Sequence, residues 1–179
     1  MMYTDKFDRC FQKLLVNEGG YAHLAGDSGG RTWYGVSERY QSAYFARIVD
    51  ADAPEARLAI AKECYHKEYW TPMLCEEFTD RLAFRLFDTT VVAGRFVATK
   101  CLQRACALAG ATLVVDGRMG PKTLAVARTL CERYERNLVG WMTCYVGDHF
   151  QRVAENPEQR KFLWGWGARL VEPGLPQGG

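Results

Sequence analysis

The sequence has neither the long apolar runs of a membrane protein nor the clustered charge of a nucleic-acid-binding protein. No stretch of the 179-residue chain approaches the ~18 consecutive apolar residues that a membrane span requires. The charge is almost balanced, with 23 basic and 21 acidic residues and a net charge of +2, so a large basic excess is missing. We therefore expect no nucleic-acid partner and no stable membrane insertion.

Metal-ligating residues are also scarce. The chain has only three histidines, and its seven cysteines are dispersed without a Cys-x-x-Cys pair, so no zinc-site spacing can be built. We expect no metal and no organic cofactor. An odd number of scattered cysteines fits a reduced intracellular origin better than a disulfide framework, and we interpret them as small packing residues.

An uninterrupted apolar core of the kind found in signal peptides is missing from the first fifteen residues, where five charged residues occur among the apolar ones. We therefore expect synthesis in the cytoplasm of a host cell. If the protein acts outside that compartment, a membrane pore or a secretion apparatus must release it.

Helical patterns dominate the chain. Thr4 can cap a first helix whose apolar stripe includes Phe7, Phe11 and Leu14, and Gly19-Gly20 ends it. Residues 19–36 combine many glycines with tyrosine, threonine and tryptophan, which predicts turns and a short β-hairpin. Later segments predict helices from Ser37 and at about 54–69, 76–92, 94–109, 121–138, 138–154 and 157–171. We expect a mainly α fold with one small β excursion and a frayed tail from Glu172 to Gly179.

Glu18 is the strongest candidate for a catalytic residue. It ends the first predicted helix on the side of Phe11 and Leu14, where burial and the negative end of the helix dipole would both raise the pKa of a carboxyl group. A glutamate of raised pKa can act as a general acid near neutral pH, although a helix-ending glutamate can also simply form a cap or an ion pair. Asp27 and Thr32 follow in the glycine-rich segment, and a hairpin folding back would bring them opposite Glu18 across a groove. Most glycoside hydrolases use two carboxyl groups, one on each side of the glycosidic bond that they cleave.

Several sequence blocks resemble one known family. Residues 17–21 (Asn-Glu-Gly-Gly-Tyr) and 27–36 are similar to the N-terminal signature of glycoside hydrolase family 108, the lysozyme-like N-acetylmuramidases found largely in phages and prophages. The resemblance continues through residues 65–72 and 86–89. Residues 102–103, 116–123 and 162–169 resemble the predicted peptidoglycan-binding region that usually accompanies this family. The blocks occur in the family's order and cover nearly the whole chain.

The resemblance implies a lysozyme-like helical fold with a small β-hairpin next to the active-site groove. It implies cleavage of the β-1,4 bond between N-acetylmuramic acid and N-acetylglucosamine, with Glu18 as general acid and with Asp27 and Thr32 positioning water. We assign residues 1–92 to a catalytic lobe and residues 93–179 to a helical peptidoglycan-binding-like lobe packed on it.

Aromatic residues border the predicted groove. Tyr21, Trp33 and Tyr34 could stack on sugar rings or pack the hairpin on the helices, and His23 is either an exposed loop residue or a substrate contact. We name these four as candidate substrate-binding residues.

Two later blocks favour structural roles. Residues 116–121 predict a turn followed by a helix that Pro121 opens. Residues 162–166 contain Phe162, Leu163, Trp164 and Trp166, which we interpret as the apolar anchor of the last helix.

The sequence as a whole predicts a monomeric, bacteriolytic phage endolysin that acts on bacterial peptidoglycan after holin-dependent release, in the periplasm or outside the cell. Two alternatives stay open. One is a non-catalytic wall adaptor that binds peptidoglycan, and the other is an interbacterial muramidase toxin with an immunity partner.

Overall fold

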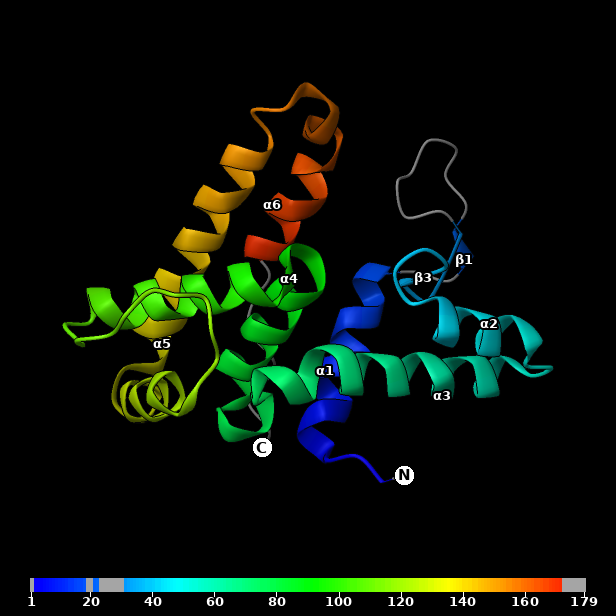
Figure 1. The fold of residues 1–179 in the computed structure, drawn as a ribbon, viewed down its shortest axis with the longest axis horizontal. Coiled ribbons are helices and arrows are strands. Elements are labelled where there is room, and N and C mark those ends of the chain that lie inside the picture. Colours follow the sequence, from blue (N-terminus) through cyan, green and yellow to red (C-terminus); the bar gives the residue numbers. More distant parts are fainter. Residues whose placement is uncertain (1, 19–20, 23–30, 172–179) are drawn as a thin grey trace. The chain divides into compact units, whose positions relative to one another are not determined.

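The computed structural model describes residues 2–18, 21–22 and 31–171, with backbone alone for 16–18 and 21–22. The chain divides into two compact units, Met1–Pro72 and Met73–Gly179 (Figure 1). The predicted fraying of the C-terminal tail concerns residues outside this description. The sequence predicts a boundary between residues 92 and 93 that separates a catalytic lobe from a peptidoglycan-binding-like lobe. The two units of the structure are defined by packing and not by function, so this boundary stays a prediction.

The first unit begins with helix α1 (Asp5–Glu18). The Thr4 hydroxyl accepts a hydrogen bond of 3.2 Å from the backbone N–H of Phe7, which is the capping interaction that the sequence predicts. Phe7, Phe11 and Leu14 are completely buried, so the predicted apolar stripe is confirmed. Lys62 pairs with Asp8 across 2.6 Å and joins α1 to the helix that contains Lys62.

Three two-residue strands follow, β1 (Tyr21–Ala22), β2 (Thr32–Trp33) and β3 (Val36–Ser37). They form an antiparallel sheet in the order β1-β2-β3. Strand β2 therefore lies in the middle, with Thr32 opposite Ala22 on one side and opposite Ser37 on the other. The predicted hairpin is confirmed, and a third strand extends it.

Helices α2 (Ser42–Asp50) and α3 (Pro54–Tyr65) complete the first unit, followed by a π-helical turn, η1 (His66–Trp70), and a 3-10 turn, η2 (Thr71–Met73). Pro54 opens α3 as predicted. Helix α2 begins later than the sequence predicts, because Ser37 belongs to β3 and its hydroxyl accepts the N–H of Arg39.

The second unit contains a 3-10 turn, η3 (Cys75–Glu77), and the long element α4 (Asp80–Leu108). At Gly94 the backbone of α4 leaves helical geometry, with φ 84° and ψ 161°. This left-handed φ favours glycine, and it produces the break that the sequence predicts between two helices (Figure 1).

Helix α5 (Pro121–Val153) bends at Tyr134, four residues before the predicted break at 138. The 3-10 segment η4 (Pro157–Phe162) leads into α6 (Leu163–Val171). Figure 1 shows α6 running back along the last part of α5. The ring of Trp166 stacks on Phe150 at 4.9 Å and holds the two helices together.

Each unit has its own apolar core, and the cysteines take part in both. Six of the seven cysteines are buried free thiols, which confirms their interpretation as packing residues, and Cys144 is exposed. Burial raises the pKa of the Cys64 and Cys106 thiols to about 12, so they carry no thiolate at neutral pH. No helix in the described ranges is long and apolar enough to cross a membrane.

Candidate functional site

Glu18 is the last residue of α1, directly before the sheet. Its side chain lies outside the described atoms, but chain length limits where the sheet can be. Tyr21 follows Glu18 by three positions, a distance along the chain of at most ~11 Å, and Tyr21 pairs with Trp33 in the sheet. The end of α1 and the middle strand β2 are therefore close in space.

Strands β2 and β3 are joined by a two-residue turn. Tyr34 and Gly35 both have positive φ, 49° and 75°, which is the pattern of a type I′ hairpin turn. Glycine adopts this conformation readily, whereas a bulky residue such as tyrosine does so only when its surroundings hold it there. The turn therefore depends on contacts from outside the hairpin.

Tyr65, the last residue of α3, supplies one such contact. Its hydroxyl donates a hydrogen bond of 3.1 Å to the backbone carbonyl of Tyr34. The side chain is almost fully buried, with 1% exposed, and its ring lies 5.6 Å from that of Phe11 on α1. One side chain thus contacts both the hairpin turn and the helix that ends in Glu18.

Gln41 makes a second link to the hairpin. Its carbonyl oxygen accepts the backbone N–H of Ser37 at 2.8 Å, and its amide nitrogen donates to the Tyr69 hydroxyl at 2.7 Å. Ser37 lies opposite Thr32 in the sheet. Strand β3 is therefore connected through Gln41 to Tyr69 of η1, and β2 is connected through its pairing with β3.

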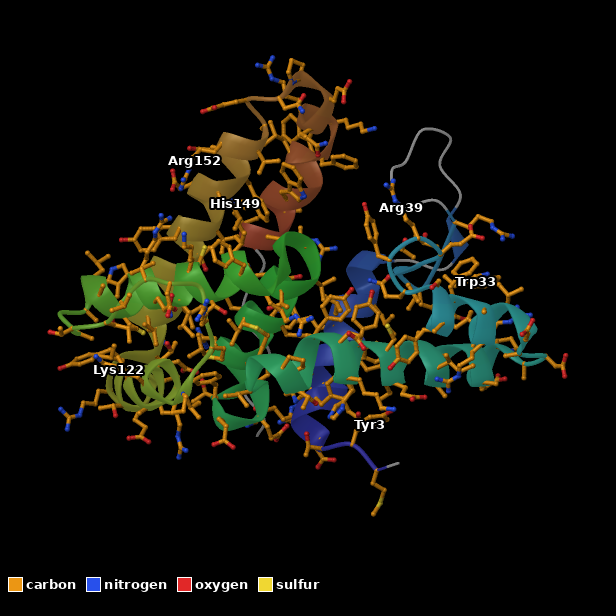
Figure 2. The ribbon with its side chains drawn as sticks, in the orientation of Figure 1. Tyr3, Trp33, Arg39, Lys122, His149 and Arg152 are labelled. Atoms are coloured by element: carbon orange, nitrogen blue, oxygen red, sulfur yellow. The ribbon has the colours of Figure 1, made fainter. Side chains whose placement is uncertain are left out.

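The aromatic candidates on the hairpin are half-buried. The Arg57 guanidinium lies 4.9 Å from the centre of the Trp33 ring and covers one face of it. Figure 2 labels Trp33 on the hairpin. Arg31, at the start of the hairpin, makes a bidentate ion pair with Glu38 at 2.7 and 3.0 Å.

Not every predicted site residue can be placed. Thr32, Trp33 and Tyr34 come together on the hairpin, and Glu18 and Tyr21 are placed by their backbone alone. His23 and Asp27 lie outside the described residues. The catalytic and substrate-binding roles predicted for all of these residues stay predictions.

A charge cluster lies on α2, α3 and η1. Glu63 accepts hydrogen bonds from Arg47 at 2.8 Å and Lys67 at 2.7 Å. These bonds, led by that from Arg47, lower the pKa of the Glu63 carboxyl to about 2.

The part of the chain that the structure describes holds no group of three metal-ligating side chains.

In the second unit, the loop before α5 is fastened by Gln103 of α4. The Gln103 amide donates to Asp116 at 2.9 Å and to the Arg118 carbonyl at 3.2 Å, and its oxygen accepts the Gly117 N–H at 2.8 Å. Gly117 has φ 75°, and a Cβ there would lie 2.5 Å from the Phe96 ring. The structural interpretation of residues 116–121 is confirmed.

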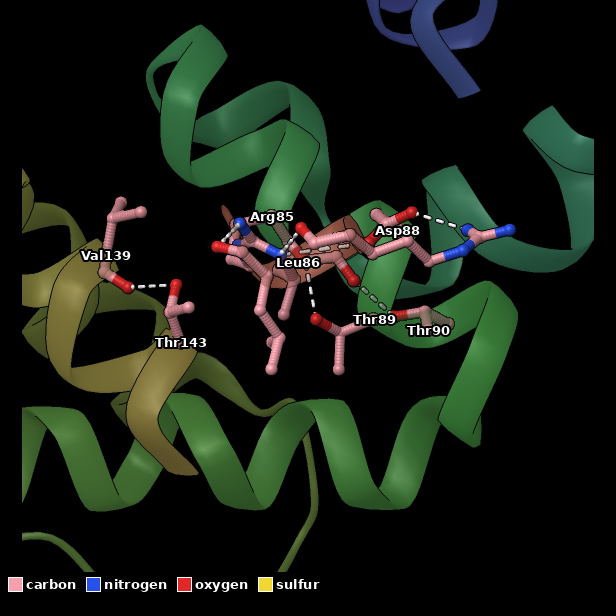
Figure 3. Close-up of polar contacts among 9 residues, drawn as sticks. Arg85, Leu86, Asp88, Thr89, Thr90, Val139 and Thr143 are labelled. Carbon is pink, nitrogen blue, oxygen red and sulfur yellow. Dashed lines mark hydrogen bonds and ion pairs between the residues drawn. The ribbon is translucent and has the colours of Figure 1, made fainter. Parts of the chain in front are cut away.

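A second buried polar cluster joins α4 to α6 (Figure 3). Asp88 is 3% exposed and accepts a hydrogen bond of 2.7 Å from Arg169. Arg85, one turn earlier on α4, donates to the backbone carbonyl of Arg169 at 3.0 Å. The C-terminal end of α6 is therefore held by charged groups of α4.

The aromatic residues before and within α6 behave differently from one another. Trp166 anchors the helix by stacking on Phe150, as the sequence predicts. The same interpretation is wrong for Trp164, which is 90% exposed, and Phe162 and Leu163 are exposed by 38% and 37%. One short helix can turn only part of its surface toward α5, and Trp164 lies off that part.

Sequence reasoning does not identify the residues that fasten the hairpin turn and the loop before α5. Tyr65 and Gln103 stand in sequence blocks that were recognised, but their side-chain partners lie 31 and 13 or more residues away. Local periodicity marks such residues as buried without revealing what their polar atoms bind. A buried tyrosine or glutamine whose polar group needs a partner was the available signal.

Comparisons with known proteins agree with this architecture. Residues 11–94 match the family described as Glycosyl hydrolase 108, and residues 97–171 match the one described as Predicted Peptidoglycan domain. A search of curated proteins found no match. A solved structure, described as "Structure of Brucella abortus SagA", resembles this chain with a TM-score of 0.67 and 22% identity, over 92% of this chain and 88% of that one. This likeness concerns the fold alone, and it confirms the predicted mainly helical, lysozyme-like architecture.

Proposed function

We propose that the chain is a muramidase, because residues 11–94 match glycosyl hydrolase family 108 and residues 97–171 match a predicted peptidoglycan domain. Its substrate is bacterial peptidoglycan, and it cleaves the β-1,4 bond between N-acetylmuramic acid and N-acetylglucosamine. The observation that carries the proposal is the match of residues 11–94, which includes both Glu18 and the hairpin that returns to the end of α1.

In the proposed mechanism Glu18 protonates the glycosidic oxygen as the bond breaks. Its position at the C-terminal end of α1 supports this role, because the helix dipole there disfavours an ionised carboxyl group. Asp27 and Thr32 position the attacking water, as in inverting glycosidases. Thr32 is on the central strand, whose two neighbours fix its backbone.

The substrate-binding surface includes the rings of Trp33 and Tyr34, with Tyr21 and His23 as further contacts. Aromatic rings can stack on the apolar faces of sugars while polar edges stay hydrated. Strand register supports the grouping, since Tyr21 is the partner of Trp33.

The second unit binds the cell wall through the exposed aromatic segment 159–165, which leads from η4 into α6. This segment holds three exposed apolar side chains, and its charged residues are Arg160 and Lys161, with no carboxylate. Peptidoglycan combines sugar rings with peptide carboxylates, so both its apolar and its anionic groups complement this surface. The ligand of this surface is a glycan strand with attached peptides.

The biological role that we propose is that of a phage endolysin. It waits in the host cytoplasm and reaches the wall through a membrane pore. The alternatives are an interbacterial toxin with the same chemistry and a non-catalytic wall adaptor.

Digestion of purified peptidoglycan followed by mass spectrometry tests the proposal. Wild-type protein should release muropeptides with N-acetylmuramic acid at the new reducing end. Glu18→Gln keeps the shape of the side chain but cannot donate a proton, so activity should fall roughly 10²–10⁴-fold while the fold is retained. Binding without any released reducing sugar would favour the wall adaptor, and full activity of Glu18→Gln would exclude Glu18 as the acid.

A further inference from the structure

The β2–β3 hairpin is too small to hold its own position. Its two strands and the neighbouring β1 have two residues each, and so small a sheet needs packing against helices to be stable. Its turn also contains Tyr34 with φ 49°, a conformation that is unfavourable for tyrosine. The place of the hairpin is therefore decided by contacts from neighbouring helices.

Tyr65 connects this hairpin to α1. Its hydroxyl donates to the Tyr34 carbonyl, the acceptor inside the strained turn, at 3.1 Å. Its ring packs at 5.6 Å against Phe11, seven residues or about two helical turns before Glu18. Tyr69 flanks the same ring at 5.5 Å, so the Tyr65 side chain is confined on several sides.

We infer that Tyr65 is a positioning residue, which sets the distance between the end of α1 and the hairpin that carries Thr32. This inference rests on the proposed function, in which Glu18 and Thr32 act on the same bond. Misplacement of a catalytic group by ~1 Å can cost up to about 10²-fold in rate. Loss of the Tyr65 hydroxyl would free the turn while the ring keeps its packing against Phe11.

Tyr65→Phe tests the inference through two readouts. In peptidoglycan digestion, kcat should fall about tenfold while KM changes less than about twofold, because the substrate-binding surface is retained. In hydrogen exchange, the backbone amides of residues 33–37 should exchange about tenfold faster than in the wild type, because the turn opens more often. The second readout does not depend on the enzyme's substrate.

Two matched controls separate positioning from general loss of stability. Ile48→Val removes one methylene from the completely buried core of the first unit and should lower Tm while leaving kcat unchanged. Tyr3→Phe removes a hydroxyl near the other end of α1, where Tyr3 packs on Phe7 at 5.2 Å, and should change neither readout.

The outcomes distinguish this inference from the proposed function. Wild-type kcat and unchanged exchange in Tyr65→Phe would overturn the inference, as would an equal loss of kcat in Ile48→Val. If the wild type digests no peptidoglycan, the proposed function fails, and hydrogen exchange alone decides whether Tyr65 holds the turn. If Glu18→Gln stays active but Tyr65→Phe is slow, the assignment of Glu18 fails and Tyr65 keeps its positioning role.

Discussion

Asp88 on α4 accepts a hydrogen bond of 2.7 Å from Arg169 on α6, and the side chains are only 5% and 14% exposed. The two residues lie 81 positions apart, in sequence blocks that match two different families. Arg85 strengthens the cluster by lying 3.8 Å from Asp88 and by donating to backbone carbonyls of α6.

Replacing Arg169 tests how much the Asp88–Arg169 pair contributes to the free energy of unfolding. Arg169→Met leaves the buried Asp88 carboxylate with a more distant partner, so the free energy of unfolding should fall by about 3 kcal/mol. The double variant Asp88→Asn/Arg169→Met should cost less than the sum of the single changes. Denaturant unfolding measures both. The control Arg128→Met breaks an exposed pair with Glu77 and should cost under about 1 kcal/mol. An equal cost for both arginines would contradict a special role for the buried pair.

Gln103→Leu should also destabilise the second unit, because it removes the amide that binds the Gly117 N–H and the buried Thr123 hydroxyl. We expect a loss of about 2–4 kcal/mol in the free energy of unfolding. Gln151→Leu, at an exposed position of α5, serves as the matched control. A Tm equal to that of the control would show that the loop before α5 keeps its conformation without the Gln103 hydrogen bonds.

Glu63 should make the stability of the first unit depend on pH. Its carboxyl pKa is about 2 in the folded protein against an ordinary 4.5, so its contribution is fully present above about pH 4.5 and disappears as the pH falls through about 2. The effect is under about 1 kcal/mol, because its partner Arg47 is half exposed. Thermal unfolding of Glu63→Gln should differ from wild type at pH 6 and converge with it near pH 2. A constant difference across that range would refute the ion-pair explanation.

Trp164→Ala tests the proposed wall-binding surface. Because Trp164 is 90% exposed, its removal should leave Tm unchanged, while the amount of protein that co-sediments with purified peptidoglycan should fall by several-fold. Leu108→Ala removes an exposed apolar residue at the end of α4 and should leave co-sedimentation unchanged. Wild-type retention of Trp164→Ala would move the binding surface elsewhere.

Asp27→Ala tests the proposed water-positioning carboxylate. We expect kcat to fall far more than stability, since loop carboxylates contribute little packing. An inverting enzyme should place the Asp27 and Glu18 carboxyl groups ~6.5–9.5 Å apart, against ~5–5.5 Å for a retaining one. Proton NMR of the newly formed reducing ends would show the α anomer first. Initial release of the β anomer would establish retention.

Local chemistry was the predictable part of this structure. Thr4, Pro54 and Gly94 determine their own backbone surroundings through a cap, a helix start and a left-handed φ, so helix ends and the break in α4 followed from the sequence. Trp164 was interpreted wrongly, because hydrophobicity alone does not say which face of a short helix meets a neighbour.

The site was predictable in outline only. Glycine and aromatic content indicated a hairpin, but the hydrogen bond from Tyr65 to Tyr34 depends on how α3 packs beside it. The same holds for Asp88 and Arg169, whose pairing requires the complete arrangement of α4 and α6. Contacts between distant segments leave no periodic signal in the sequence.

Recombination between related genes would meet an obstacle in the second unit. The two family matches end and begin at residues 94 and 97, whereas the compact unit begins at Met73 and includes both halves of α4. A crossover between residues 94 and 97 would therefore combine Asp88 of this chain with an α6 that comes from the related protein. An incoming segment without an arginine equivalent to Arg169 would remove the 2.7 Å ion-pair partner of that buried carboxylate. The Asp88–Arg169 pair thus acts as a compatibility requirement on which second halves this hydrolase can exchange.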